Sequence, residues 1–203
     1  MIKTVIFDLG DVIVNVDKTE QFEKFAVKSN KSVPYLKKYF DNSYLRKAYG
    51  RGELSSRQFY CKTAKELNLK MGFNEFKKAW CNIFTLNKNV EKLVRDLKRN
   101  FKLVLLSNTD ELHFEYIKNK FKIVNDFDEY VLSYIEGCMK PNPLIFWRAI
   151  KKSKTAPFNC VYLDDIYGFV FVARLMGVKA FQYKNFKKLV DDLNKVKVLT
   201  KVL

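Results

Sequence analysis

Three short apolar runs in the sequence end in polar side chains, and a lysine follows a fourth run. In chain order these side chains are a carboxylate, a hydroxyl, an ammonium and a carboxylate pair: Asp8, Ser107, Lys140 and Asp164-Asp165. Three acids can hold a hard cation, and the hydroxyl and ammonium can hold an anion. Oxygen-only ligation with open positions suits Mg²⁺, which binds few carboxylates together with water and phosphate oxygens. These residue types predict a joint site for a divalent cation and an anion, if the fold brings them together.

The segments that must position these side chains have the composition of buried strands. Short runs rich in Val, Ile, Leu and aromatic residues are expected as strands at 5–7, 102–106, 130–133, 160–163 and 178–183. From Val90 onward, segments with helical spacing alternate with these runs, which predicts a parallel sheet with helices on both faces. The carboxyl ends of parallel strands lie along one edge, where open α/β sheets bind their ligands. The predicted fold class is therefore α/β, with a Rossmann-like parallel sheet.

A long helical insertion is expected directly after the first strand. From about Thr19 to Lys88 the apolar residues recur at helical spacing, and no convincing strand interrupts them. The last apolar group, from Phe73 to Phe84, is expected on one helix. We predict a core domain formed by residues 1–15 and 89–203, and a helical cap domain formed by residues 16–88.

Charge and composition limit the partners of this chain. It has 203 residues, 48% of them hydrophobic, and a formal net charge of +16. Lysines spread along the whole chain carry most of this charge, and no arginine-rich arm, RNA-binding aromatic motif or zinc-finger spacing accompanies them. We expect no specific nucleic-acid binding. A generally basic surface would attract small phosphorylated anions by long-range steering.

Cysteine and histidine usage indicates the compartment and excludes some chemistry. The four cysteines lie far apart without a C-x-x-C pair, and the start of the sequence has no signal-peptide pattern. We expect a cytoplasmic protein, with no membrane association, that is a monomer or a homodimer. The single histidine, His113, excludes a histidine-cluster metal site and disfavours a Ser-His-acid triad.

Four segments of the sequence resemble the haloacid dehalogenase superfamily, and the resemblance covers essentially the whole chain. F-D-L-G-D-V-I-V resembles the first motif of that family, L-L-S-N-T the second and M-K-P-N-P the third. Y-L-D-D followed by A-R-L-M-G-V resembles the fourth. Within the family the chain is most similar to bacterial sugar-phosphate phosphatases, some of which act on hexose 1-phosphates such as glucose 1-phosphate.

This resemblance implies a Mg²⁺-dependent phosphatase that hydrolyses small phosphorylated metabolites through an aspartyl-phosphate. Asp8 would be the nucleophile, and Ser107 with Asn108 would bind the phosphate. Lys140 would neutralise charge on both the nucleophile and the phosphate. The implied metal ligands are Asp8, the backbone carbonyl of Gly10 and Asp165, with Asp164 bound through water or in an outer layer.

The sequence departs from this family at the position two residues after the nucleophile. An aspartate usually stands there as general acid and base, a function typically worth ~10²–10⁴-fold in rate. This chain has Gly10 instead, although its bacterial relatives with G-N-V share the gap. Asp11 can take over the acid–base role if the chain turns sharply after Gly10, whereas in a continued strand it would face away.

A second departure follows Asp165, where the family usually has polar residues that support the metal loop. This chain has Ile166, Tyr167, Gly168 and Phe169 there. Loss of supporting hydrogen bonds can cost about 10–100-fold in metal affinity, unless backbone groups replace them. Two alternatives to the phosphatase therefore stay open. One is a weakened or silent phospholigand-binding protein, and the other is a metal-independent dehalogenase.

Overall fold

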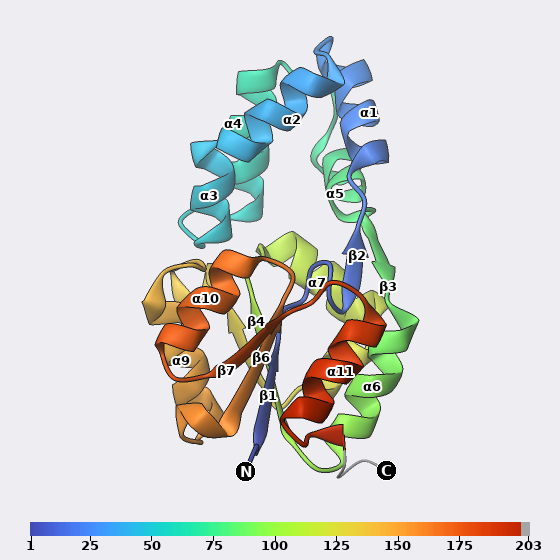
Figure 1. Ribbon diagram of the computed structural model, residues 1–203. Helices are drawn as coiled ribbons and strands as arrows, with labels where there is room; N and C mark the ends of the chain where they lie inside the picture. Colours follow the sequence, from blue (N-terminus) through green and yellow to red (C-terminus); the bar gives the residue numbers. More distant parts are fainter. Residues whose placement is uncertain (200–203) are drawn as a thin grey trace.

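The computed structural model describes residues 1–199 as a layered α/β body with a group of helices above one end of its sheet (Figure 1). The strands are β1 Thr4–Phe7, β2 Val14–Val16, β3 Phe84–Leu86, β4 Lys102–Ser107, β5 Glu129–Leu132, β6 Cys160–Asp164 and β7 Lys179–Gln182. The helices are α1 Thr19–Ser29, α2 Val33–Asn42, α3 Tyr44–Gly50, α4 Ser56–Leu67, α5 Phe73–Cys81, α6 Lys88–Lys98, α7 Glu111–Lys120, α8 Ser133–Glu136, α9 Pro143–Ser153, α10 Tyr167–Leu175 and α11 Phe186–Lys195. Two 3₁₀ helices, η1 Lys122–Asp126 and η2 Pro157–Asn159, precede β5 and β6.

The central sheet has five parallel strands in the order β5-β4-β1-β6-β7. Phe7 of β1 is level with Leu105 of β4 and with Leu163 of β6. The residues that follow these three therefore emerge at the same edge of the sheet. The predicted fold class, a parallel Rossmann-like sheet with helices on both faces, is confirmed.

Alternate residues of each strand face opposite layers of helices, because successive side chains of a strand point to opposite sides. Val5 and Phe7 belong to the apolar cluster that includes the buried faces of α6 and α11. Ile6 belongs to the cluster on the other face, beneath α9 and α10. Polar residues at the ends of these strands are thus held on a backbone that is packed from both sides.

The helices α1–α5, which we call the cap helices, lie above the carboxyl edge of the sheet (Figure 1). They have their own apolar cluster, rich in aromatic side chains such as Phe25, Phe59, Phe76 and Trp80. The chain enters the cap helices through β2 and leaves through β3, and these two strands pair antiparallel. The division into domains at residues 15/16 and 88/89 stays a prediction, and these positions fall close to the two strands.

One sequence expectation in this region is wrong. The helix expected to extend from Phe73 to Phe84 ends at Cys81, and Phe84 lies on β3. The three-residue strands β2 and β3 are too short to show a period of their own. Pairing between Val16 and Phe84 across the two connections, a contact between residues far apart in sequence, creates them.

Contacts on two sides hold the cap helices against segments that follow strands of the central sheet. On one side the indole N–H of Trp80 donates to the carboxylate of Asp110, at 3.2 Å to its nearer oxygen, and His113 stacks on the indole ring. On the other side the hydroxyl of Ser133 donates to the carbonyl of Gly50, at 2.6 Å. Next to it, Gly52 has a φ of +72°, and a Cβ at this position would overlap the carbonyl oxygen of Tyr134. Glycine is required there by both conformation and space.

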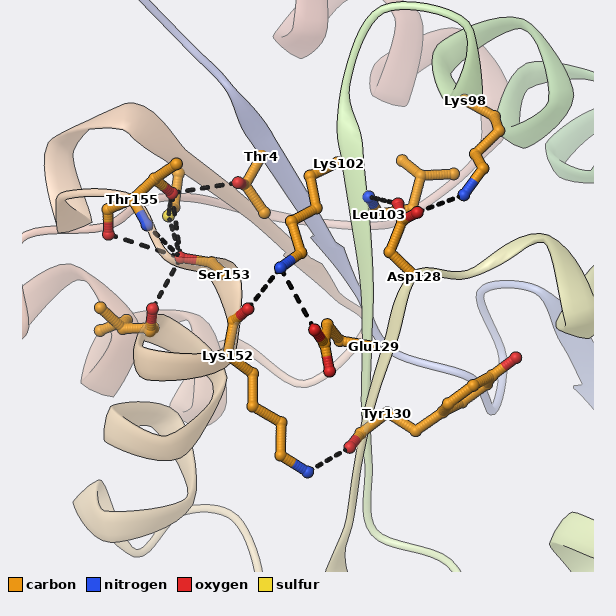
Figure 2. A network of polar contacts seen from close by, with 12 residues as sticks. Thr4, Lys98, Lys102, Leu103, Asp128, Glu129, Tyr130, Lys152, Ser153 and Thr155 are labelled. Carbon is orange, nitrogen blue, oxygen red and sulfur yellow. Dashed lines mark hydrogen bonds and ion pairs between the residues drawn. The ribbon is translucent and has the colours of Figure 1, made fainter.

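The opposite, amino-terminal edge of the sheet carries a polar network that ties strands to helices (Figure 2). The ammonium of Lys102 donates to the carbonyl of Lys152 at 2.6 Å and lies 3.3 Å from a carboxylate oxygen of Glu129. Lys152 in turn donates to the carbonyl of Tyr130, at 2.7 Å. Asp128 accepts hydrogen bonds from the backbone of Leu103 and from a lysine of α6. These charged side chains at this edge are therefore paired with one another and with backbone carbonyl groups.

No helix within residues 1–199 combines the length and apolarity that crossing a lipid bilayer requires.

Candidate active site

The register of the sheet brings the acids predicted from sequence together. Asp8 follows β1, its backbone N–H donates to the carbonyl of Leu163, and Asp164 is the next residue on β6. Asp8, Asp164 and Asp165 each offer a carboxylate oxygen, and these three oxygens lie within 4.8 Å of one another. An oxygen-only cluster of this size fits the ligand preference of Mg²⁺.

Lys140 reaches this cluster from the loop before α9. Its Nζ lies 2.8 Å from Oδ1 of Asp8 and 2.6 Å from Oδ2 of Asp164, and it also donates to the carbonyl of Leu106. The side chain is only 1% exposed. Burial alone would lower the pKa of this amine, but the two carboxylates outweigh burial and raise the pKa. Lys140 is therefore an ammonium ion throughout the neutral range.

Asp8 has one occupied and one open oxygen. Oδ1 accepts the N–H of Leu9 at 2.7 Å and faces Lys140, whereas no residue of the described chain donates a hydrogen bond to Oδ2. Burial, opposed by Lys140 and assisted by the negative charge of Asp164, raises the pKa of Asp8 to about 7 in the ion-free protein. An added cation would favour the ionised carboxylate.

Asp164 is buried behind the site, and its oxygens are occupied by protein donors. Oδ1 accepts the backbone N–H of Ile166 at 2.8 Å. Oδ2 accepts both the ammonium of Lys140 and the phenol O–H of Tyr162. The phenol oxygen itself lies 3.2 Å from Nζ of Lys140. Asp164 is thus held by Tyr162 and by the backbone N–H of Ile166, which gives this carboxylate supporting hydrogen bonds without polar side chains after Asp165.

Asp165 lies closer to solvent and lines the cavity. Burial and the neighbouring Asp164 raise its pKa, and it forms no salt bridge with any residue from 1 to 199. The ring of Phe169, one of the unexpected residues of this loop, lies 5.2 Å from Nζ of Lys140. The ammonium lies over the face of this ring, so that Phe169 supports Lys140 by a cation–π contact.

Ser107 and Asn108 occupy different positions although they are adjacent in sequence. Ser107 is buried at the end of β4, borders the cavity, and its hydroxyl is not bonded to other residues within the described chain. The Asn108 amide donates to the carbonyl of Lys140 at 2.9 Å and accepts the N–H of Lys140 at 2.7 Å. The side chain of Asn108 therefore holds the lysine loop. The predicted contact between Asn108 and phosphate stays a prediction. Because the side chain is bonded to the lysine loop, the backbone of Asn108 would have to make this contact.

The chain turns sharply at Gly10, as the acid–base role of Asp11 requires. Asp11 has a φ of +52°, and its N–H donates to the carbonyl of Val14. One carboxylate oxygen of Asp11 accepts the N–H of Val16 at 3.0 Å, and both Gly10 and Asp11 line the same cavity as Asp8. The position two residues after Asp8 carries no acid, but Asp11, one residue further along, lines the same cavity.

The cavity between the sheet edge and the cap helices has a volume of about 350 Å³. This is within the range of ~300–1,000 Å³ for small-molecule sites. Its floor carries Asp8, Ser107, Lys140 and Asp165, and its walls include apolar residues of the connecting strands such as Val16 and Phe84. The opposite wall contributes two cations, Lys18 and Arg46.

Sequence reasoning did not find Tyr162, Lys18 or Arg46 as site residues. Tyr162 stands inside a buried strand, where an aromatic residue is typical of a core, and only the packing shows its hydroxyl against Lys140. Lys18 and Arg46 are two among many lysines and arginines. Nothing in their local sequence separates them from surface charges.

The comparison with protein families gives one match that covers most of the chain. The sequence pattern of the haloacid dehalogenase-like hydrolases matches residues 2–167. A D-ribitol-5-phosphate phosphatase of Bacteroides thetaiotaomicron is 26% identical over 193 residues, which cover 91% of this chain and 93% of that protein.

Solved structures show the same fold. A HAD family enzyme of Bacteroides thetaiotaomicron, in complex with magnesium and inorganic phosphate, is similar with a TM-score of 0.82. The two chains are 21% identical, and the match covers 91% of this chain and 95% of the other. A predicted HAD-like family hydrolase of Porphyromonas gingivalis is similar with a TM-score of 0.83 and 20% identity, covering 97% and 98% of the two chains.

Proposed function

This chain belongs to the haloacid dehalogenase-like hydrolase family, and on this basis we propose that it is a Mg²⁺-dependent phosphatase of small phosphomonoesters. One observation carries the proposal. Three carboxylates lie within 4.8 Å of one another; Asp8 and Asp165 line a cavity floor with a buried lysine, whose Nζ lies 2.8 Å from Asp8, and Asp164 lies behind them. This arrangement can neutralise a phosphate group before a carboxylate attacks it.

Mg²⁺ would be held by the carboxylates of Asp8 and Asp165 and by the backbone carbonyl of Gly10. Asp164 would contact the ion only through water or through the direct ligands, because its two oxygens already accept hydrogen bonds from protein donors. When bound, the ion supplies positive charge that reduces the repulsion between a carboxylate and a phosphate dianion.

The nucleophile in this proposal is the open Oδ2 of Asp8, since Oδ1 is held by Leu9 and Lys140. Oδ2 attacks phosphorus, an aspartyl-phosphate forms, and the bond to the leaving-group oxygen breaks. Lys140 and the hydroxyl of Ser107 stabilise charge on the phosphoryl oxygens. Water then attacks phosphorus, which releases inorganic phosphate and restores Asp8.

Asp11 is the proposed acid and base of this reaction. Its carboxylate borders the cavity and is oriented by the N–H of Val16. As an acid it would protonate the leaving-group oxygen, and as a base it would accept a proton from the attacking water. A position on a turn instead of the strand allows a residue three places after the nucleophile to face the same substrate.

The substrates in this proposal are small phosphorylated metabolites of the sugar or polyol phosphate class. A cavity of about 350 Å³ under the cap helices has the size of a small-molecule site, which supports this class. The curated relative whose name specifies D-ribitol 5-phosphate supports this class. A dehalogenase would not need the cluster formed by Asp8, Asp164 and Asp165.

The test is a screen of sugar and polyol phosphates with purified protein, Mg²⁺ and phosphate detection. We expect turnover that EDTA abolishes and Mg²⁺ restores. Asp8→Asn should remove activity, whereas Asp191→Asn, a matched change on the exposed face of α11, should keep it. Turnover by Asp8→Asn equal to that of the wild type would remove Asp8 from the mechanism. Release of halide from a haloacid in EDTA would instead support a dehalogenase.

A further inference from the structure

Two cations on the cap side of the cavity have no task in the phosphoryl chemistry described above. Lys18 lies immediately before α1, and Arg46 lies on α3. Both line the cavity whose floor carries Asp8 and Lys140. A phosphoryl group held on the floor would therefore direct its leaving group toward this pair.

Some cations of the cap helices are paired with carboxylates, but the two that line this cavity are not. Lys24 pairs with Glu20, Lys28 with Glu75, and Arg51 with Glu53. Neither Lys18 nor Arg46 has a carboxylate within salt-bridge distance among residues 1–199. The structure thus keeps two positive side chains unneutralised at the wall of a binding cavity.

The two cations also act on each other. Burial and the charge of Arg46 together lower the pKa of Lys18, and Asp41 and Asp11 only partly oppose this. Two like charges that share a partly desolvated wall repel each other. An anion placed between them would relieve this repulsion and would gain charge-assisted hydrogen bonds.

The floor of the cavity has no ammonium left for such an anion. Lys140, which contacts Asp8, Asp164, Leu106 and Tyr162, is the ammonium already assigned to the nucleophile and the transferred phosphoryl group. Any second negative group on a substrate must therefore find its partner on the cap wall, where Arg46 offers a planar guanidinium suited to carboxylate or phosphate.

We propose that Lys18 and Arg46 form a subsite for a second anionic group, so that the preferred substrates are phosphomonoesters with an acidic leaving group. A carboxylate and a second phosphate share the required chemistry. This inference rests on the proposed phosphatase function, because it assigns the part of the substrate that the phosphoryl site does not bind.

The test compares esters that differ only in the second charge. The pairs are 6-phosphogluconate with glucitol 6-phosphate, and 3-phosphoglycerate with glycerol 3-phosphate. Glucitol 1,6-bisphosphate tests phosphate as the second group. For the wild type we expect kcat/KM to be about tenfold higher for the acidic member of at least one pair, as for a partly exposed charge-assisted contact.

Variants assign the preference to the two cations. Arg46→Gln and Lys18→Gln should each bring the ratio of kcat/KM for the acidic and neutral esters close to one. Lys38→Gln is the matched control, because it removes one positive charge from an exposed position of α2 outside the cavity. It should keep the wild-type ratio. A ratio near one in the wild type, or an unchanged ratio in both cavity variants, overturns the proposal.

A binding experiment separates failure of this inference from failure of the phosphatase proposal. Asp8→Asn protein with Mg²⁺ is titrated calorimetrically with each ester, and the acidic members should bind about tenfold more tightly. Hydrolysis without any acidic preference leaves the phosphatase proposal standing and rejects the subsite. Acidic preference in binding without wild-type turnover supports the subsite and rejects the phosphatase. Binding of neither member of a pair rejects the subsite.

Discussion

The two edges of the central sheet both carry a lysine bound by acids and carbonyl groups, but the two lysines differ in what surrounds them. Lys102 at the amino-terminal edge is 25% exposed and joins Glu129 to the end of α9. Lys140 at the carboxyl edge is 1% exposed and lies between two carboxylates beside a cavity. Salt bridges at a surface contribute ~0–1 kcal/mol, whereas removal of one partner of a buried pair typically costs about 3–5 kcal/mol. The lysine that pairs at the surface edge and the lysine proposed to act in a reaction thus differ in burial and in the presence of an adjacent cavity.

Replacement of Lys140 by methionine should give the largest effect of any change at the two edges. It leaves Asp8 and Asp164 buried without their cation, and we expect unfolding free energy to fall by about 3–5 kcal/mol. Activity should fall at least ~10²–10³-fold, as for other losses of a preorganised charge donor. Chemical denaturation and phosphate release measure the two effects. If Lys140→Met folds and turns over like the wild type, the contrast between the edges is lost.

The second largest effect should be a difference between the two edges in how the unfolding free energy depends on pH. At the carboxyl edge, burial raises the pKa of Asp8 to about 7 without metal. Folding then favours the protonated acid, so this contribution is present below its unfolded pKa near ~4 and is lost as pH rises to about 7. We expect the metal-free protein to lose about 2–4 kcal/mol across this window through Asp8. Denaturation in EDTA measures the loss, which Mg²⁺ should reduce and Asp8→Asn should remove.

At the amino-terminal edge the sign is opposite. The backbone N–H of Leu103 and the ammonium of Lys98 outweigh burial and lower the pKa of Asp128. Its contribution is present above the unfolded pKa near ~4 and is lost only as pH falls below it. A metal-free stability profile that is flat between pH 4 and 7 would contradict the role assigned to Asp8.

Tyr162→Phe should have an intermediate effect, because it removes a hydroxyl that both accepts from Lys140 and donates to Asp164. The ring remains packed against Phe146, so the core is retained. We expect apparent Mg²⁺ affinity to fall by about tenfold, as for the loss of other outer hydrogen bonds of metal sites. The measurement is activity as a function of Mg²⁺, with kcat at saturating metal reported separately. An unchanged Mg²⁺ requirement would make the tyrosine only a core residue.

Lys102→Met should give the smallest effect. This lysine has half-exposed partners at an edge without a catalytic cavity, so we expect unfolding free energy to change by no more than about 1 kcal/mol. Activity should be unchanged. Thermal unfolding and turnover, compared with Lys140→Met, give the matched pair. A loss of activity comparable to that of Lys140→Met would show that the two edges are coupled.

The sequence allowed the sheet and the floor of the cavity to be predicted, because both depend on local signals. A buried run that ends in an acid fixes the position of Asp8, and parallel strands then bring Asp164 and Asp165 to the same edge. The roles of these residues remain proposals. Tyr162 and Asn108 could not be assigned as partners of Lys140, since their contacts join residues 22 and 32 positions apart in the chain. The strands β2 and β3 were missed for the same reason.

Gly52 gives the space above the floor a fixed height. The chain after α3 contacts the carbonyl of Tyr134 so closely that no Cβ fits between them, and the hydroxyl of Ser133 holds the neighbouring Gly50. Backbone atoms, which cannot rotate away as side chains can, therefore act as a spacer between roof and floor. Any larger residue at position 52 would push the end of α3 away from Tyr134, and because Arg46 of α3 lines the cavity, it would displace one wall without touching the residues of the floor.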